Sequence, residues 1–358
     1  MAQGVPVKPD RAQRGDDPLV FRVAELFLGG RGAGLSPSDI AAKVSGEFAR
    51  KPALTREAIY PLIGEAVRRG FLRLVPPVDR QLAEQVSAKY PSLHPGALHV
   101  VQTAGPHDNA KVAVVAAELA LQHLADVLKT KRGPVVGVGL GPGRATLDFC
   151  RAFSSLLAGY PEPVKLKLVA ISAGCPANEP EFASISFFNL FPPHVVDSKV
   201  GLFAETLVPL KDFNQIKGRA GVKEAFEAQP DIDLVVTSMG DVRDEHDLLC
   251  TFLRQSSKEG VGRLLRRGCI GNVQYRPYTA KGPVEEQPGD LRAVTLYELD
   301  GLVQFAGQKN KHVILIARQC GMCKRTRAEA LRPLLTNPNL KVFSTLVMDA
   351  ATARELLQ

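Results

Sequence analysis

From about residue 81 onwards, short runs rich in valine, isoleucine and leucine alternate with longer segments whose apolar residues recur every three or four positions. The short runs predict buried strands, and the longer segments predict amphipathic helices. Strands and helices that alternate in this way form parallel sheets with crossover helices, so few other folds are compatible with the pattern. We therefore predict a doubly wound, Rossmann-like α/β domain over residues 81–358.

The same pattern places the individual elements of this domain. The expected strands are Pro134–Gly139, Lys165–Ser172, Gly201–Leu210, Asp233–Met239, His312–Ala317 and Leu340–Val347. The expected helices lie near residues 110–129, 143–158, 217–229, 244–257, 324–335 and 350–357. No apolar run approaches the ~18 residues of a membrane helix, so we expect no membrane partner.

Residues 18–80 have the spacing of a small helical domain. One face of a first helix is indicated by Val20, Val23, Ala24, Phe27 and Leu28. Ser36 and Pro37 predict the start of a second helix, and a third runs from about Arg56 to Gly70. The segment 71–77 (FLRLVPP) alternates like a strand. Three helices and a strand predict a winged helix-turn-helix, preceded by a disordered polar lead-in over residues 1–17 rather than a signal peptide.

Positive charge is concentrated around the third predicted helix. The chain carries a formal net charge of +8, and residues 50–80 hold seven Lys or Arg against three Asp or Glu. Such a cluster suits contacts with DNA phosphates, although a helical cap or dimerisation module with a solvated basic face would have the same pattern. If the segment binds double-stranded DNA, we expect Thr55, Arg56 and Tyr60 to face the major groove. The expected phosphate contacts are Arg50, Lys51, Arg68, Arg69 and Arg73.

A glycine-rich turn, VGVGLGPGRATL over residues 136–147, separates the first expected strand from a helix. It lacks the dinucleotide-binding spacing, because Pro142 or Arg144 stands where the last glycine is required. It is not a P-loop, since the chain has no Gly-Lys-Ser or Gly-Lys-Thr. What remains is a small anion site made by free backbone N–H groups, Arg144 and Thr146 at a helix start.

Ligands of open α/β sheets bind at the carboxyl ends of the strands, so we expect residues from several strand ends to form one site. These ends offer small residues, amides, hydroxyls and cations that suit a polyhydroxylated, phosphorylated ligand, and none pairs a serine or histidine nucleophile with a base. The expected effector-binding residues are Gly139, Gly141, Gly143, Arg144, Thr146, Ser172, Gly174, Gly240, Asp241, Gly321 and Lys324.

The six cysteines are interpreted as reduced thiols. Cys320 and Cys323 form a C-x-x-C pair at a strand-to-helix turn, which is compatible with a redox pair, a metal site or two small turn residues. Zinc needs two further ligands and there is no second C-x-x-C, so we predict neither a metal nor a cofactor. Acidic residues over 241–247 are interpreted as helix caps. This interpretation is compatible with a His246 side chain that faces the pocket.

Five segments occur in an order typical of one protein family. They are Gly137–Thr146 (GVGLGPGRAT), Ser172–Gly174 (SAG), Gly268–Tyr278 (GCIGNVQYRPY), Ala317–Lys324 (ARQCGMCK) and Val347–Leu357 (VMDAATARELL). The chain resembles, from about Val20 to its end, the sorbose-operon-regulator (SorC) family of bacterial transcription regulators, and the last segment is the most specific match. The sequence departs from the family pattern in having no tryptophan and in carrying Asn272 where an acid is usual.

The resemblance implies an N-terminal DNA-binding domain and an effector domain related to sugar-phosphate isomerases. It also implies homodimers or homotetramers that respond to sugars or sugar phosphates, and we expect a cytoplasmic regulator without catalytic activity. Two other functions are compatible with the residues. One is a sugar-phosphate isomerase-like enzyme with Asp241 as base, and the other is a ligand-free scaffold whose basic helix contacts protein or RNA. A regulator that has lost its effector is a further alternative.

Overall fold

The computed structural model describes residues 16–29, 34–72, 75–94, 96–131, 133–158, 160, 164–175, 177–257 and 259–358. The chain divides into two compact units whose main boundary in the sequence falls between Leu74 and Val75, a few residues before the boundary expected at residue 80. The expected lead-in lies outside the described residues except for Asp16 and Asp17, and Asp17 begins the first described helix.

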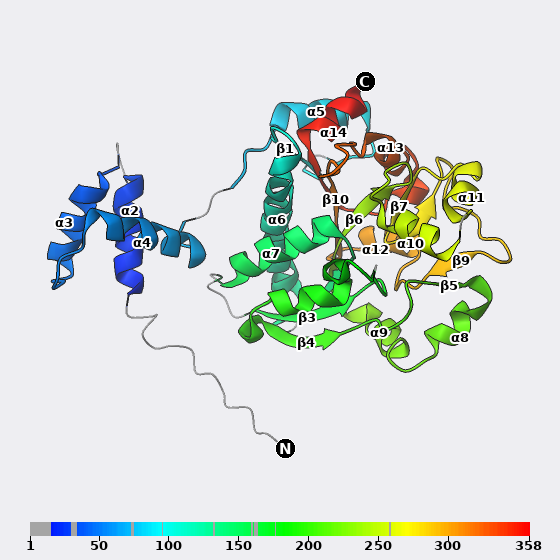
Figure 1. Cartoon of the computed structure of the whole chain (residues 1–358), viewed down its shortest axis with the longest axis horizontal. Helices are drawn as coiled ribbons and strands as arrows, with labels where there is room; N and C mark the ends of the chain where they lie inside the picture. Colours follow the sequence, from blue (N-terminus) through cyan, green and yellow to red (C-terminus); the bar gives the residue numbers. More distant parts are fainter. Residues whose placement is uncertain are drawn as a thin grey trace, which may run out of the picture. The chain divides into compact units, whose positions relative to one another are not determined.

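A mainly parallel sheet forms the centre of the second unit (Figure 1). Its parallel strands have the order β1-β11-β10-β6-β2-β3-β4, which confirms the α/β class predicted from the sequence. The bounds are β1 (Leu98–Val101), β2 (Val135–Leu140), β3 (Lys165–Ala170), β4 (Val196–Val200), β6 (Ile232–Asp241), β10 (His312–Ala317) and β11 (Thr345–Asp349). Strands β2, β6, β10 and β11 are almost wholly buried, as apolar runs in a covered parallel sheet require.

Helices connect these strands. They are α5 (Arg80–Lys89), α6 (Asn109–Thr130), α7 (Arg144–Ala158), α8 (Phe213–Lys217), α9 (Lys223–Glu227), α10 (Leu248–Ser256), α11 (Gly260–Arg266), α12 (Leu299–Ala306), α13 (Ala328–Thr336) and α14 (Ala350–Leu357). The longest, α6, buries a continuous apolar face against β10, β11 and β6. Asp349 ends β11 and caps α14 by accepting a hydrogen bond from the Thr352 N–H at 2.8 Å.

Three predictions about this unit are wrong in detail. The expected strand Gly201–Leu210 is reduced to β5 (Leu207–Pro209), and the true edge strand β4 was missed because its half-exposed sequence VDSKV is not an apolar run. The expected helix over residues 217–229 breaks into α8 and α9, because Gly221 between them has a positive φ of 80°. The last strand begins at Thr345 rather than Leu340, since Pro338–Leu340 forms a 3₁₀ turn.

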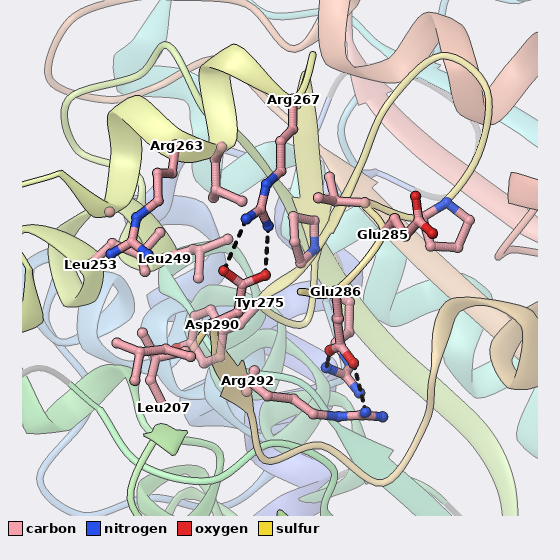
Figure 2. A pocket seen from close by; sticks show the side chains of 18 of the residues that line it. Leu207, Leu249, Leu253, Arg263, Arg267, Tyr275, Glu285, Glu286, Asp290 and Arg292 are labelled. Carbon is pink, nitrogen blue, oxygen red and sulfur yellow. Dashed lines mark hydrogen bonds and ion pairs between the residues drawn. The ribbon is translucent and has the colours of Figure 1, made fainter. Parts of the chain in front are cut away.

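Short antiparallel strands extend this framework. Strand β7 (Gly271–Val273) pairs with the end of β6 and with β8 (Arg276–Tyr278), while β5 pairs with β9 (Leu291–Ala293). Beside α10, α11 and β9 lies a cavity of about 630 Å³. Figure 2 shows that arginines around it are joined to carboxylates, Arg267 to Asp290 and Arg292 to Glu286.

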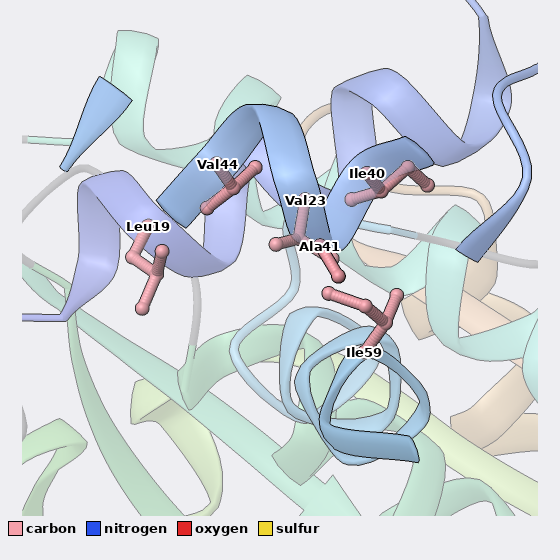
Figure 3. Close-up of a cluster of buried hydrophobic side chains, with 6 residues drawn as sticks. All are labelled: Leu19, Val23, Ile40, Ala41, Val44 and Ile59. Carbon is pink, nitrogen blue, oxygen red and sulfur yellow. The ribbon is translucent and has the colours of Figure 1, made fainter. Parts of the chain in front are cut away.

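The described part of the first unit contains three helices, α2 (Asp17–Leu28), α3 (Pro37–Glu47) and α4 (Arg56–Arg68). As predicted, Ser36 caps α3 by accepting a hydrogen bond from the Asp39 N–H at 3.3 Å. The three helices share a buried cluster (Figure 3) made of Leu19, Val23, Ile40, Ala41, Val44 and Ile59. This arrangement matches the helical part of the predicted domain.

The prediction of a wing strand over residues 71–77 is wrong for the described residues of this segment. Residues 71–72 form a bend and residues 75–77 are irregular, while residues 73–74 lie outside the described part of the chain. Phe71 and Leu72 pack instead against the cluster formed by Val20, Ala24 and Ala66. The apolar character of these two residues therefore reflects packing at the end of α4 rather than strand pairing.

Candidate effector pocket and DNA-binding helices

The order of the strands reverses at β2. Strand β3, which follows β2 in the chain, lies on one side of it, and β6 lies on the other. Loops that leave such a switch point in opposite directions open a crevice at the carboxyl ends of the strands. A cavity of about 100 Å³ lies there, lined by the turn after β2, the end of β6, the β7–β8 turn and the loop after β10. We call it the strand-end pocket.

The glycine-rich turn shapes this pocket mainly through packing. A Cβ on Gly141 would lie 2.2 Å from the Thr237 hydroxyl, so the glycine allows the end of β2 to approach β6. Gly143 has a φ of 108°, which suits glycine, and its N–H donates to the Phe182 carbonyl at 2.9 Å. The first-turn N–H groups of a helix have no intrahelical partner. Gly143, Arg144 and Ala145 line the pocket at the start of α7, as an anion site requires.

Arg144 is already engaged in this structure. Its guanidinium is ion-paired with Glu179 and stacks on the Phe182 ring at 4.5 Å from the centroid. Two further arginines line the pocket and also have carboxylate partners, Arg318 with Asp148 and Arg327 with Asp244, both at 2.7 Å. A bound anion would therefore share or replace these ion pairs.

Three side chains that line the pocket carry buried polar atoms without a hydrogen-bond partner. Among the described residues, neither amide atom of Gln274 has one, nor has the Tyr275 hydroxyl or the Nη1 atom of Arg327. Gln274 and Tyr275 are 3% and 4% exposed. Each buried unpartnered group costs ~1–3 kcal/mol, which a polar ligand would offset. Sequence reasoning missed both residues, although they lie in the segment Gly268–Tyr278 that supports the family resemblance.

Backbone geometry holds this pair in place. Gln274 and Tyr275 form the two-residue turn between β7 and β8, with φ of 53° and 64°. Two consecutive positive φ values are typical of a type I′ hairpin, where Asn-Gly is preferred. Larger residues in this region cost ~1–2 kcal/mol each, and such strain is concentrated at functional sites. The turn therefore presents two strained polar residues to the pocket.

A buried pair beside the turn explains Asn272. The Asn272 side-chain N–H donates to the Asp247 carboxylate at 3.0 Å, and the same carboxylate caps α10 by accepting from the Cys250 N–H at 2.9 Å. Burial raises the pKa of Asp247. An ionised acid at position 272 would repel this carboxylate, whereas the amide stabilises it. Of the acidic segment 241–247, Asp247 is thus a helix cap, as expected, whereas Asp244 pairs with Arg327.

The predicted effector residues divide into two groups. Four of them, Gly143, Arg144, Gly240 and Gly321, line the strand-end pocket. The other seven do not: Gly139, Gly141, Thr146, Ser172, Gly174, Asp241 and Lys324. Asp241, the base considered for an isomerase, is 2% exposed, and burial raises its pKa. Its carboxylate accepts a hydrogen bond from the Arg243 N–H at 2.9 Å.

Local packing explains why most of the second group lies away from the pocket. The Thr146 hydroxyl donates to the Pro142 carbonyl at 3.4 Å, and Ser172 forms a bridge to Thr295. A Cβ on Gly174 would overlap Thr206. Lys324 is exposed. The sequence pattern shows which residues follow a strand, but it does not show which strand ends are neighbours. In the folded chain only the loops at the switch point meet around one cavity.

Four potential metal ligands meet at the rim of the pocket. Asp244, His246, Cys320 and Cys323 each offer one ligand atom, and these atoms all lie within 4.8 Å of one another. Burial disfavours the charged form of Asp244, but the Arg327 guanidinium and the His246 N–H outweigh it and hold the pKa of this carboxyl well below its ordinary value. Burial and the hydrogen bond to Asp244 raise the pKa of the Cys323 thiol to about 11. Without a metal, Cys323 is therefore a poor redox nucleophile at neutral pH.

The exposed side of the first unit carries most of the residues expected to contact DNA. Thr55 precedes α4, Arg56 is hydrogen-bonded to Tyr60 one turn later, and Lys51 is exposed. Tyr60 is 50% exposed. This leaves Lys51, Arg56 and Tyr60 open to a ligand as large as DNA.

The remaining predicted phosphate contacts are arginines with carboxylate partners. Arg50 is paired with Asp16, and Arg68 with Glu65. Arg69 is paired with both Glu65 and Asp17, so it joins α4 to the start of α2. Arg73 lies outside the described residues.

Comparison with solved structures finds the same fold in regulators of sugar operons, and the α/β class with an N-terminal helical region is therefore shared with them. The full-length sorbitol operon regulator SorC from Klebsiella pneumoniae is 16% identical, with a TM-score of 0.62 over 98% of this chain and 100% of that chain. A probable sor operon regulator from Shigella flexneri is 18% identical, with a TM-score of 0.56 over 78% and 99%.

The α/β unit by itself has similar counterparts. The putative sugar-binding domain of a transcriptional repressor from Vibrio fischeri is 14% identical, with a TM-score of 0.54 over 78% of this chain and 98% of that chain. No protein-family model and no curated protein sequence matches the chain. None of the helices in the described ranges has the length and hydrophobicity of a membrane span.

Proposed function

We propose that this protein is a transcription regulator that binds double-stranded DNA through α3 and α4 and responds to a sugar phosphate in the α/β unit. The observation that carries the proposal is the set of buried, unpartnered polar atoms around the strand-end pocket, in a chain that also has exposed cationic residues at and before the start of α4. The full-length likeness to a sugar-operon regulator supports the combination. We propose a homodimer or homotetramer, as the family resemblance implies.

The dimensions of the two cavities suggest how the effector lies. The strand-end pocket, at about 100 Å³, can hold a group the size of a phosphate. A complete sugar phosphate needs the volume of ~300–1,000 Å³ typical of ligand sites. Tyr275 lines both this pocket and the larger cavity of about 630 Å³. We place the phosphate at the start of α7 and the sugar toward Tyr275.

The effector assignment is tested with Gln274→Met in the full-length protein. Methionine fills the space of glutamine without a buried amide, so the unliganded variant is expected to be as stable as the wild type or more so. Wild type should be stabilised against heat by at least one phosphorylated sugar. The variant should bind that compound about 10–100-fold more weakly. Thermal shift and calorimetry measure both quantities.

Gln304→Met provides the matched control, because Gln304 is exposed on α12. It should bind the effector like the wild type. Equal binding by Gln274→Met would show that the effector lies elsewhere. Stabilisation by inorganic phosphate alone, with no preference for any sugar phosphate, would contradict a sugar-phosphate effector.

The DNA-binding assignment rests on Lys51, Arg56 and Tyr60. Arg56 and Tyr60 stand at the start of α4, the second helix of the pair, whose first residues reach base edges in helix-turn-helix proteins. Lys51 precedes this helix and is suited to a phosphate contact. Arg50 and Arg68 are exposed and can also reach phosphates by exchanging their carboxylate partners, since ion pairs at the surface are worth only ~0–1 kcal/mol.

Substitutions at Arg56 and Lys51 should have different effects. Arg56→Ala is expected to weaken binding to the selected operator by ~1–3 kcal/mol and to relax the preference at one base pair. Lys51→Ala should weaken binding to all sequences and lower the salt slope by ~1. Selection from a random DNA library followed by salt-dependent binding measures these effects. Arg151→Ala, an exposed arginine on α7, should change neither. Binding that is insensitive to salt and sequence would refute the proposal.

A further inference from the structure

The Cys320–Cys323 pair does not stand alone in the folded chain. Strands β6 and β10 are parallel neighbours, so the loops that follow them meet at the same edge of the sheet. The first loop carries Asp244 and His246, and the second carries both cysteines. Folding thus supplies the two additional ligands that a C-x-x-C pair needs and that no sequence motif indicated.

The distances between the ligand atoms match a tetrahedral metal site. The Cys320 Sγ lies 3.8 Å from the His246 Nδ1, and the Cys323 Sγ lies 3.2 Å from the Asp244 Oδ1. The His246 Nδ1 and the Asp244 Oδ1 are 3.3 Å apart. A tetrahedral zinc ion with its usual bond lengths separates its sulfur, nitrogen and oxygen ligands by ~3.3–3.8 Å. No large movement is needed to close four ligands around one ion.

The surroundings also suit a metal. Two thiolates and one carboxylate on a divalent ion leave one negative charge, and the Arg327 guanidinium lies 2.7 Å from the free Asp244 oxygen, Oδ2. A backbone N–H of Arg325 donates to the Cys323 thiol, in the manner of turns that hold metal-bound sulfur. The outer nitrogen of the imidazole, Nε2, lies on the side of the exposed Glu245 carboxylate, 3.9 Å away. Asp244 and Cys323 thus each have a hydrogen-bonded neighbour that positions them.

We propose that Asp244, His246, Cys320 and Cys323 bind one zinc ion, which joins the β6–α10 loop to the β10–α13 loop at the rim of the strand-end pocket. Thiolate and imidazole ligands favour zinc over magnesium or calcium. Four protein ligands leave no open position for a reacting water, so the ion has a structural role. The assignment does not depend on the proposed regulator function.

The test uses the full-length protein, purified with reduced thiols and stripped of metal by a chelator. Addition of Co²⁺ should saturate at one ion per chain and produce the sulfur-to-cobalt absorption and the intense visible bands of a tetrahedral thiolate site. Zn²⁺ should then displace cobalt, raise the melting temperature and protect Cys320 and Cys323 from alkylation. His246→Gln should lower zinc affinity by more than the ~10–100-fold that loss of an outer partner costs. Cys320→Ser with Cys323→Ser should abolish the sulfur-to-cobalt absorption.

Cys175→Ser is the matched control, since Cys175 is a half-buried thiol outside the cluster, and it should bind zinc like the wild type. Failure of the wild type to bind Co²⁺ or Zn²⁺ would overturn the proposal. So would an undiminished zinc affinity in His246→Gln, or an unchanged cobalt spectrum in the double cysteine variant. If the double variant does not fold, the alkylation pattern of the wild type with and without zinc decides the question. Equal alkylation rates of Cys320 and Cys323 in the two states would then reject the site.

Discussion

Ile59→Ala is expected to unfold the N-terminal unit and to abolish DNA binding while leaving the α/β unit folded. Ile59 is completely buried on α4 and is part of the cluster that joins this helix to α2 and α3 (Figure 3). Truncation of a buried isoleucine to alanine costs ~2–5 kcal/mol. A core of this size rarely supplies more than ~3–5 kcal/mol. Most of the stability of the unit should therefore be lost.

Calorimetry of the full-length variant measures this effect through the loss of the transition that belongs to the N-terminal unit. Affinity for the operator should be lost as well, because the exposed face of α4 is held in place by the same buried cluster. Val67→Ala on the same helix is the control. Val67 is 43% exposed, so its truncation should change stability by ~0.5 kcal/mol or less. A variant at Ile59 that melts and binds DNA like Val67→Ala would contradict the role assigned to this core.

Gly141→Ala should destabilise the α/β unit. The added Cβ would lie 2.2 Å from the Thr237 hydroxyl oxygen, 2.7 Å from the Thr237 Cβ and 3.2 Å from its Cα. Rotation of the threonine side chain moves only its hydroxyl and methyl groups, so β2 and β6 must separate. Overpacking of a buried site costs ~1–3 kcal/mol, and the backbone contact places this variant at the upper end. We expect the melting temperature of the unit to fall by roughly 5–10 °C.

Gly301→Ala controls for the loss of glycine itself. Gly301 lies within α12, and apart from its chain neighbours and its own helix backbone no atom of the described residues lies within 4 Å of the position its Cβ would take. Alanine is favoured over glycine in a helix by ~1 kcal/mol, so the melting temperature should stay the same or rise slightly. If both variants melt like the wild type, close contact between β2 and β6 does not explain the glycine at position 141.

The main strands and long helices were predictable because their periodicity reflects local burial. Strand β10 was predicted over the residues that form it, and α6, α7 and α14 were predicted within one residue or so of their ends. Edge strands β1 and β4 and the short strands β7, β8 and β9 were not predicted. Their residues pair at an edge or in a hairpin, where packing on one side leaves no continuous apolar run.

The candidate site was predicted only in part for a similar reason. The turn at Gly143 and Arg144 has a local signature, since a strand, glycines and a helix start are consecutive in the chain. Gln274 and Tyr275 have none, because their role depends on a hairpin that brings them to other loops, among them the turn at residues 142–145, which is more than a hundred residues away in the sequence.

The sequence by itself determined the α/β class, the three N-terminal helices and the failure of the glycine-rich turn to match nucleotide-binding motifs. These features follow from the spacing of residues that are close along the chain. Only the tertiary structure decided which strand ends share a pocket and which polar groups lack partners. It also decided that Asp244 and His246 lie beside Cys320 and Cys323. These facts depend on the strand order, in which β6 and β10 become neighbours although helices and hairpins separate them in the chain.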